Sequence, residues 1–160
     1  GYAARYPENT RESLAAAVQA GARFLEFDVQ LSADGVPVLL HDDTVQRTAG
    51  RPGSVFELSA AELSRIEVNE TARLGPAFSG VRIPLLQDVV ADLTAWPGVT
   101  AFVELKPQSL AHFGIGYMLD RVLQTLAPVL DACVVISFSA PSVEEARRRT
   151  GCEVGWAIEK

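Results

Sequence analysis

Hydrophobic stretches alternate along the chain with short polar connections that contain Gly and Pro, and this pattern predicts alternating helices and strands. In the first predicted helix, Asn9 is the expected N-cap, Glu12 is its capping-box partner, and Gly21 follows the helix end. The polar segment 44–84 holds one predicted short helix, capped by Ser59 with Glu62 three residues later. Helices are predicted within residues 9–22, 84–96, 114–130 and 142–150, and strands within residues 25–43, 100–106, 132–139 and 153–159.

The segment 25–43 predicts a β-hairpin, because Asp34-Gly35 is a two-residue turn signal between two apolar runs. Counting outward from that turn pairs Asp28 with His41 across the hairpin. Side chains alternate along a strand and directly paired residues share a face, so Glu26, Asp28 and His41 are expected on one face.

The residues around these three, Phe24, Leu25, Phe27, Val29, Val38, Leu39 and Leu40, predict that both faces of the hairpin are buried. Buried carboxylates require a partner, commonly a metal ion or another cation. The hairpin is therefore a candidate site and more than a structural element.

After the hairpin, helices and strands alternate with short connections, which predicts parallel strands joined by crossover helices. An open doubly wound sheet and a closed (β/α) barrel both fit this order. Glu104 and Lys106 end one strand and Ser137 and Ser139 end the next, which favours a barrel with its site at the C-terminal strand ends. No glycine-rich phosphate loop follows a strand, which counts against a dinucleotide-binding fold. We therefore predict an α/β protein of the (β/α)8 TIM-type.

A complete barrel takes roughly 250 residues, so residues 1–160 are predicted to form one incomplete barrel domain. The first strand is expected before Gly1 and about two further strands after Lys160. Because closure of a barrel pairs its edge strands, this segment alone is expected to be inactive and prone to aggregate.

The amino-acid composition restricts the classes of molecule that the chain is expected to bind. About half of the 160 residues are hydrophobic and the net charge is −6, which counts against a nucleic-acid surface and means that an anionic substrate needs local positive charge. No segment has the length of a membrane-spanning helix, so stable membrane insertion is not expected. The two cysteines, Cys133 and Cys152, do not form a disulfide framework, which leaves the compartment open. The oligomeric state also stays open.

The candidate site residues together have the side-chain types that one reaction class requires. Glu26, Asp28 and Glu104 offer three hard oxygen ligands from separate strands, which suits Mg²⁺ or Ca²⁺. His41 is close enough for acid/base work, and Lys106 supplies a fixed positive charge. A divalent cation, a lysine and an imidazole together favour phosphoryl-ester chemistry on a small-molecule phosphodiester.

Five segments carry a family resemblance: GYAARYPENT, EFDVQLSADGVPVLLHDDTVQRTAG, IPLLQDVV, VELK and ISFS. In order and spacing they resemble the glycerophosphodiester phosphodiesterases. The resemblance implies a (β/α) barrel that hydrolyses glycerophosphodiesters to an alcohol and glycerol 3-phosphate. It also implies metal ligation by Glu26, Asp28 and Glu104, acid/base catalysis by His41, and substrate-phosphate contact by Lys106. Of the family's His-Arg-Gly motif only the glycine, Gly1, is present, so the second catalytic histidine and a phosphate-binding arginine are expected as the two residues just before it.

Each candidate has a structural alternative. Glu26 and Asp28 are possible salt-bridged core carboxylates, His41 a histidine that merely satisfies a hydrogen bond, and Lys106 a counter-charge for Glu104. Other barrel phosphodiesterases, acting on phosphatidylinositol or lysophospholipids, and a non-catalytic barrel that binds phosphoglycerols remain as alternative functions.

Further residues are less specific. Glu8 belongs either to a helix start or to the site, and Trp156 either lines the pocket or packs in the barrel core. His112 is expected on a surface loop after the strand that carries Glu104. The turn after His41 is expected to be ordered by Asp42, Asp43, Arg47 and Thr48.

Overall fold

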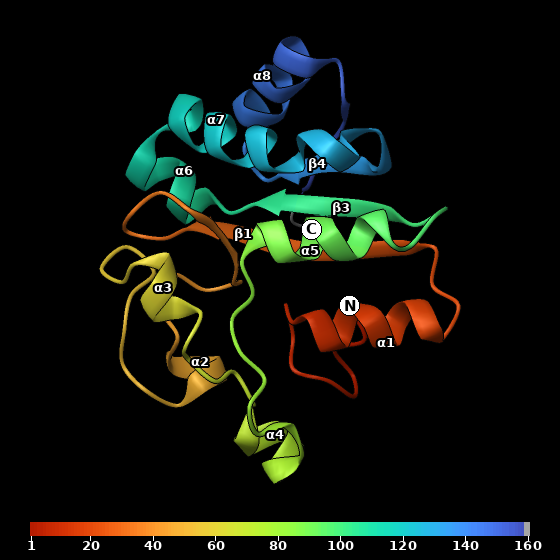
Figure 1. The fold of residues 1–160 in the computed structure, drawn as a ribbon. Helices are drawn as coiled ribbons and strands as arrows, with labels where there is room; N and C mark the ends of the chain where they lie inside the picture. Colours follow the sequence, from red (N-terminus) through yellow and green to blue (C-terminus); the bar gives the residue numbers. More distant parts are fainter. Residues whose placement is uncertain (159–160) are drawn as a thin grey trace.

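The computed structural model, which describes residues 1–158, is built on one five-stranded sheet with the order β2-β1-β3-β4-β5 (Figure 1). Strands β1, β3, β4 and β5 are parallel to their neighbours, and only β2 pairs antiparallel, with β1. The strands are β1 (Phe24–Leu31), β2 (Pro37–Leu39), β3 (Thr100–Leu105), β4 (Cys133–Ser137) and β5 (Glu153–Trp156).

The parallel strands follow one another across the sheet in sequence order, without the reversal that defines a doubly wound fold. Successive parallel strands are joined through helices, as in a (β/α) barrel. Within the described residues the sheet does not close on itself. The prediction of an α/β, TIM-type arrangement in an incomplete barrel is therefore confirmed.

Four longer helices flank the sheet, α1, α5, α7 and α8 (Figure 1). The remaining helical segments are α6 and a series of short turns between β2 and α5 or before β4. The bounds are α1 (Arg11–Gln19), α2 (Gln46–Ala49), α3 (Ala60–Leu63), α4 (Thr71–Leu74), η1 (Gly75–Phe78), α5 (Leu86–Thr94), α6 (Pro107–Phe113), α7 (Ile115–Leu126), η2 (Ala127–Ala132) and α8 (Ala140–Thr150).

One face of the sheet is buried by the four longer helices. Leu25, Phe27 and Val29 of β1 are buried in a cluster with Leu14 of α1 and Met118 of α7. Because side chains alternate along a strand, the residues between them face the other side of the sheet. The sheet therefore carries an apolar outer face and a separate inner face on which polar groups can stand.

The prediction that both faces of the hairpin are buried is wrong at Phe24, and it is also wrong at Glu26 and His41, which are exposed. Phe24 is 69 % exposed and lies on the inner face, next to the ring of Phe102 at a centroid distance of 6.3 Å. The other hydrophobic residues named in that prediction are buried.

Strand β2 separates two apolar clusters. Leu39 belongs to the cluster under the helices, whereas Val38 and Leu40 belong to a second cluster built mainly from the segment between β2 and α5. This segment contains several one-turn helices where the sequence predicted only one. The predicted one is present as α3, and Ser59 and Glu62 form its capping box. The segment therefore has its own small core beside the sheet.

The hairpin register differs by one residue from the prediction. Val29 pairs with Leu39 and Leu31 with Pro37, a register that would align Asp28 with Leu40 rather than with His41. The loop contains three residues, Ala33, Asp34 and Gly35, because Ser32 bonds to Val36 and Gly35 adopts a left-handed φ of 72°. Such a loop, a turn followed by a left-handed glycine, is a common alternative to the two-residue turn.

The N-cap of α1 is Thr10, not Asn9 as predicted. The Thr10 hydroxyl accepts a hydrogen bond from the backbone of Ser13 and donates one to the carbonyl of Pro7. Asn9 instead has a left-handed φ of 52°, so its side chain is free for another role, described below.

Replacing Thr10 with Ala is expected to lower the free energy of unfolding by about 1 kcal/mol, because the cap bond to Ser13 is lost. Thr10→Ser, which keeps the hydroxyl, should stay close to the wild type. Urea denaturation followed by circular dichroism measures both. If Thr10→Ala unfolds at the wild-type midpoint, Thr10 does not cap the helix.

The C-terminal half agrees with the prediction except at α6, at residues 127–130, which belong to the 3-10 helix η2 and not to an α-helix, and at the end of the final strand. Residues 107–113 form this helix, so His112 lies in a helix and not in a loop; its ring stacks on Phe56 at 4.3 Å. Helix α8 ends before Gly151, which has a φ of 70°. The final strand ends at Trp156; Glu159, the last residue of the predicted strand, lies outside the described residues.

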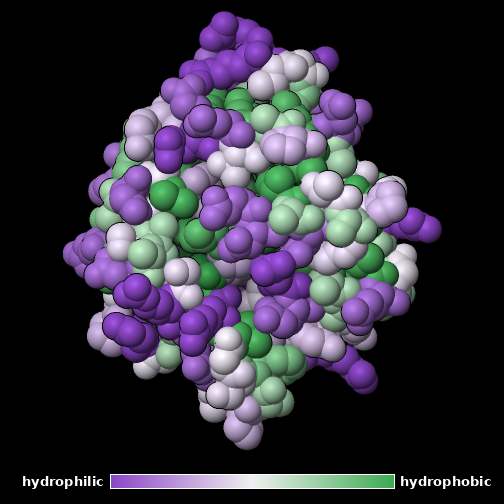
Figure 2. Space-filling model, viewed as in Figure 1, coloured by the Kyte–Doolittle hydropathy of each residue, from purple (hydrophilic) through white to green (hydrophobic). Residues whose placement is uncertain are grey.

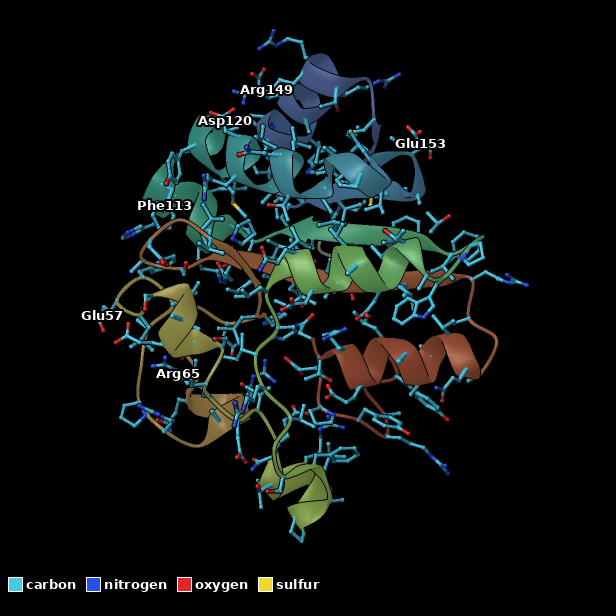
Figure 3. All side chains as sticks on the ribbon, viewed as in Figure 1. Glu57, Arg65, Phe113, Asp120, Arg149 and Glu153 are labelled. Carbon is cyan, nitrogen blue, oxygen red and sulfur yellow. The ribbon has the colours of Figure 1, made fainter. Side chains whose placement is uncertain are left out.

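The surface over α8 is hydrophilic, as the top of the view in Figure 2 shows. Two of its arginines are ion-paired: Arg148 contacts Glu145 at 2.6 Å, and Arg149 contacts Asp120 of α7 at 2.5 Å, a pair labelled in Figure 3. Among residues 1–158, no helix combines the length and hydrophobicity needed to cross a membrane.

Candidate active site

Three carboxylates gather on the inner face of the sheet. Glu26 and Asp28 are two residues apart on β1, and Asp28 is in register with Glu104 on the neighbouring strand β3. One carboxylate oxygen from each of the three lies within 4.8 Å of the other two. Parallel register and side-chain alternation thus bring together the three residues that the sequence singled out as metal ligands.

Lys106 lies beside this acidic group and contacts two of its three members. Its ammonium nitrogen is 2.8 Å from Glu104 Oε1 and 3.2 Å from Asp28 Oδ1, and the residue is only 4 % exposed. Burial by itself would lower the pKa of Lys106, but the hydrogen bond to Glu104 and the charge of Asp28 outweigh it, so the pKa is raised. Lys106 is therefore a permanent cation at the site and does neutralise Glu104.

Glu26 is the least satisfied of the three carboxylates. Its side chain reaches solvent, yet it stands in a concave, densely surrounded position. Desolvation, followed by repulsion from Asp28, raises the pKa of Glu26 to about 7. Lys106 pairs with Asp28 and Glu104 but not with Glu26, so Glu26 is the carboxylate of the group that has no cationic partner among the described residues.

Asn9 holds Asp28 in place, a role that the sequence reasoning missed. Its amide nitrogen donates to Asp28 Oδ2 at 2.8 Å, and its amide oxygen accepts from the backbone nitrogen of Asp28 at 3.0 Å. Asn is one of the few residues that tolerate a left-handed φ, which this geometry requires. Asn9 and Thr10 are neighbouring residues of the types that cap helices, and only one of them can be the N-cap. The sequence therefore held one sign that the other residue has a different role.

His41 follows β2 and lies beside the acidic group. It lines a cavity of about 200 Å³ together with Glu26 and Asp28, and a second cavity of about 680 Å³ together with Lys106. Its Nδ1 lies 2.7 Å from Asp42 Oδ1. The hairpin pairing that was expected to place His41 on this face is wrong, but the chain past the strand end still brings it there.

Glu8 does not join the carboxylate group. Its two oxygens accept from the Arg47 guanidinium at 2.6 and 2.9 Å, and Arg47 also donates to Asp42 at 2.8 and 3.0 Å. The backbone nitrogen of Glu8 donates to the buried carboxylate of Glu70. Glu8 is thus in contact with the turn after His41, as Arg47 and Asp42 were expected to be. Asp43 and Thr48 contribute there only through backbone bonds.

The larger cavity opens at the C-terminal ends of the strands. Besides His41 and Lys106 it is lined by Phe138 and Trp156. Trp156 is 63 % exposed, and its indole nitrogen donates to the Phe138 carbonyl at 3.2 Å. Of the two roles considered for Trp156, the structure places it at the cavity and not in a core. Ser137 is buried and donates to Leu105, so it connects two strands instead of facing the cavity.

The chain resembles known proteins over most of its length. A family model described as the glycerophosphoryl diester phosphodiesterase family matches residues 1–144. Glycerophosphodiester phosphodiesterase 1 of Homo sapiens is 35 % identical over 152 residues, which cover 95 % of this chain and 44 % of that protein.

Solved structures show the same fold. A phosphodiesterase from Oleispira antarctica, solved in complex with the product sn-glycerol-3-phosphate, has a TM-score of 0.82 at 27 % identity, covering 98 % of this chain and 62 % of that one. A glycerophosphodiester phosphodiesterase from Thermotoga maritima has a TM-score of 0.77 at 26 % identity, covering 100 % of this chain and 60 % of that one. The chain thus spans less than two thirds of the proteins that it matches.

Proposed function

The chain belongs to the glycerophosphoryl diester phosphodiesterase family, and we propose that it carries the active site of an enzyme that hydrolyses glycerophosphodiesters to an alcohol and glycerol 3-phosphate. The observation that carries this proposal is the position of His41. It lies between a cavity that contains Lys106 and a smaller one that contains two of the three clustered carboxylates. The relative from Oleispira antarctica, solved with sn-glycerol-3-phosphate, supports the product.

The substrate phosphodiester is an anion, and this chain has a net charge of −6. A local cation is therefore needed to bind it. Lys106 lines the larger cavity, and its raised pKa keeps its ammonium group protonated. In the proposed reaction an oxygen nucleophile, either water or the 2-hydroxyl group of the substrate, loses a proton and bonds to phosphorus, the bond from phosphorus to the alcohol oxygen breaks, and that oxygen takes up a proton. If the 2-hydroxyl attacks, water then opens the cyclic phosphate.

His41 is proposed as one of two acid/base groups in this reaction. With Asp42 at Nδ1, the Nε2 atom is the nitrogen available to exchange a proton with substrate or water. The second group is proposed to be a histidine two residues before Gly1, with a phosphate-binding arginine between them. Gly1 lines the smaller cavity beside Glu26 and His41, which supports a position near the edge of the same site for these two residues.

The three carboxylates fit a divalent cation, proposed to be Mg²⁺ or Ca²⁺. Their oxygens are hard ligands within 4.8 Å of one another. Lys106 contacts only Asp28 and Glu104, and the repulsion from Asp28 that, after desolvation, raises the pKa of Glu26 supports a further cation there. Each oxygen of Asp28 that is already bonded keeps a further lone pair for a cation. A bound cation would supply charge stabilisation to the phosphoryl oxygens.

The test is to incubate the full-length protein, in which the barrel is complete, with glycerophosphocholine or glycerophosphoethanolamine and added Mg²⁺ or Ca²⁺, because residues 1–160 alone are expected to be inactive. Glycerol 3-phosphate, measured with glycerol-3-phosphate dehydrogenase, is expected in equal amount to the free alcohol. Lysophosphatidylcholine and phosphatidylinositol are offered in parallel. Release of phosphocholine in place of choline, or turnover of only the lipid substrates, would contradict the proposal, and binding without turnover would favour a non-catalytic barrel.

A further inference from the structure

We infer that Asp42, Arg47 and Glu8 act as one unit that positions His41, holding its ring in a single orientation and a single tautomer. The inference rests on the proposed function for its kinetic consequence, whereas the tautomer is a property of the folded chain. None of the three residues belongs to the carboxylate group that includes Glu26 and Asp28.

Asp42 contacts the imidazole of His41 directly. The hydrogen bond from Arg47, joined by the one from His41, holds the pKa of Asp42 below its ordinary value. Asp42 is thus a carboxylate and can only accept hydrogen bonds. The His41 Nδ1, 2.7 Å from its Oδ1, must be the donor. This leaves the lone pair of the neutral ring on Nε2.

Asp42 is itself held in one orientation by Arg47. The guanidinium of Arg47 donates through Nε to Oδ2 at 2.8 Å and through Nη2 to Oδ1 at 3.0 Å. Two parallel bonds from a planar fork fix the carboxylate plane, which one ammonium group cannot do. Arg47 lies five residues beyond Asp42, near the start of α2.

Arg47 is in turn held by Glu8, which comes from a distant part of the chain. Glu8, 39 residues earlier, receives two hydrogen bonds from the far side of the guanidinium, at 2.6 and 2.9 Å. The buried Glu70 accepts a bond from the backbone of Glu8, and Glu70 is in turn paired with Arg73. The guanidinium is therefore held from two sides.

This arrangement connects the two halves of the site. Asn9, the residue after Glu8, holds Asp28 of the carboxylate group. The loop before α1 thus fixes a carboxylate through one residue and the histidine through its neighbour. Solvent-exposed ion pairs contribute little to stability, and Arg47 is about half exposed, so stability alone is a weak reason for four hydrogen bonds to one guanidinium.

The kinetic test uses three variants: Asp42→Asn, Arg47→Lys and Glu8→Gln. Removal of outer hydrogen-bond partners from a reactive histidine is expected to lower kcat by roughly 10–100-fold for Asp42→Asn. KM should change less than about twofold, because none of the three is placed on the substrate. Arg47→Lys keeps the charge but not the fork, so its kcat should fall well below the wild-type value.

Arg11 and Asp92 provide a matched control. They form the same kind of two-bond pair, at 2.6 Å, with nearly the same exposure, but between α1 and α5. Arg11→Lys and Asp92→Asn are expected to keep wild-type kcat. If the Arg47 and Arg11 variants behave alike, Arg47 is an ordinary surface ion pair and the inference is wrong.

The tautomer is tested without any activity. In protein labelled with ¹⁵N-histidine, His41 is assigned with a His41→Gln variant, and its two ring nitrogens are observed at a pH where the ring is neutral. The wild type should show a protonated Nδ1 and an unprotonated Nε2, and Asp42→Asn should lose this preference. A protonated Nε2 in the wild type overturns the inference. An inactive wild type with the expected tautomer would overturn only the proposed function.

Discussion

Replacing His41 with Ala is expected to lower kcat for glycerophosphodiesters by roughly 10²–10⁴-fold, the usual contribution of a general acid or base. Metal affinity should be nearly unchanged, because His41 is not in the group of Glu26, Asp28 and Glu104. Steady-state release of glycerol 3-phosphate measures the first effect, and calorimetric titration with Mg²⁺ or Ca²⁺ measures the second.

His112 is the natural control, since the chain has only two histidines. It stacks on Phe56 in α6 and lines neither of the two cavities that contain His41. His112→Ala should keep kcat within about twofold of the wild type, because no proton transfer depends on it. Near-native turnover of His41→Ala with glycerophosphocholine would remove His41 from the mechanism.

The second large effect is expected when divalent cations are removed from the enzyme. Excess chelator is expected to abolish turnover, and Mg²⁺ or Ca²⁺ to restore it, because three neighbouring carboxylates repel one another unless a cation joins them. Glu104→Gln should weaken metal affinity by more than the roughly 10–100-fold that loss of an outer partner costs. Part of its activity should then return at high metal concentration.

Glu57→Gln serves as the control for this change, because Glu57 is an exposed glutamate outside the carboxylate group (Figure 3). Its metal affinity and turnover should equal those of the wild type. Full activity in excess chelator, with no ion found by elemental analysis, would contradict the metal proposal and leave Lys106 as the site's principal cation.

Several features of this protein follow from short-range patterns, and the sequence by itself was enough for them. Ser59 and Glu62 are three residues apart, so their capping box is a local event. The alternation of apolar runs and polar strand ends correctly predicted the parallel arrangement and the inner face that carries Glu26, Asp28 and Glu104. These residues are in reach of one another because of strand periodicity and parallel register, which depend on few tertiary details.

Tertiary structure decided the details that depend on residues far apart in sequence. The hairpin register depended on a third loop residue, which the Asp34-Gly35 signal does not exclude. Asn9 and Thr10 both have cap chemistry, and only the proximity of Asp28, 19 residues away, gives Asn9 its other role. The pairing of Glu8 with Arg47 spans 39 residues. Periodicity and capping act within a few residues, whereas such contacts exist only after the chain has packed, so no local pattern specifies them.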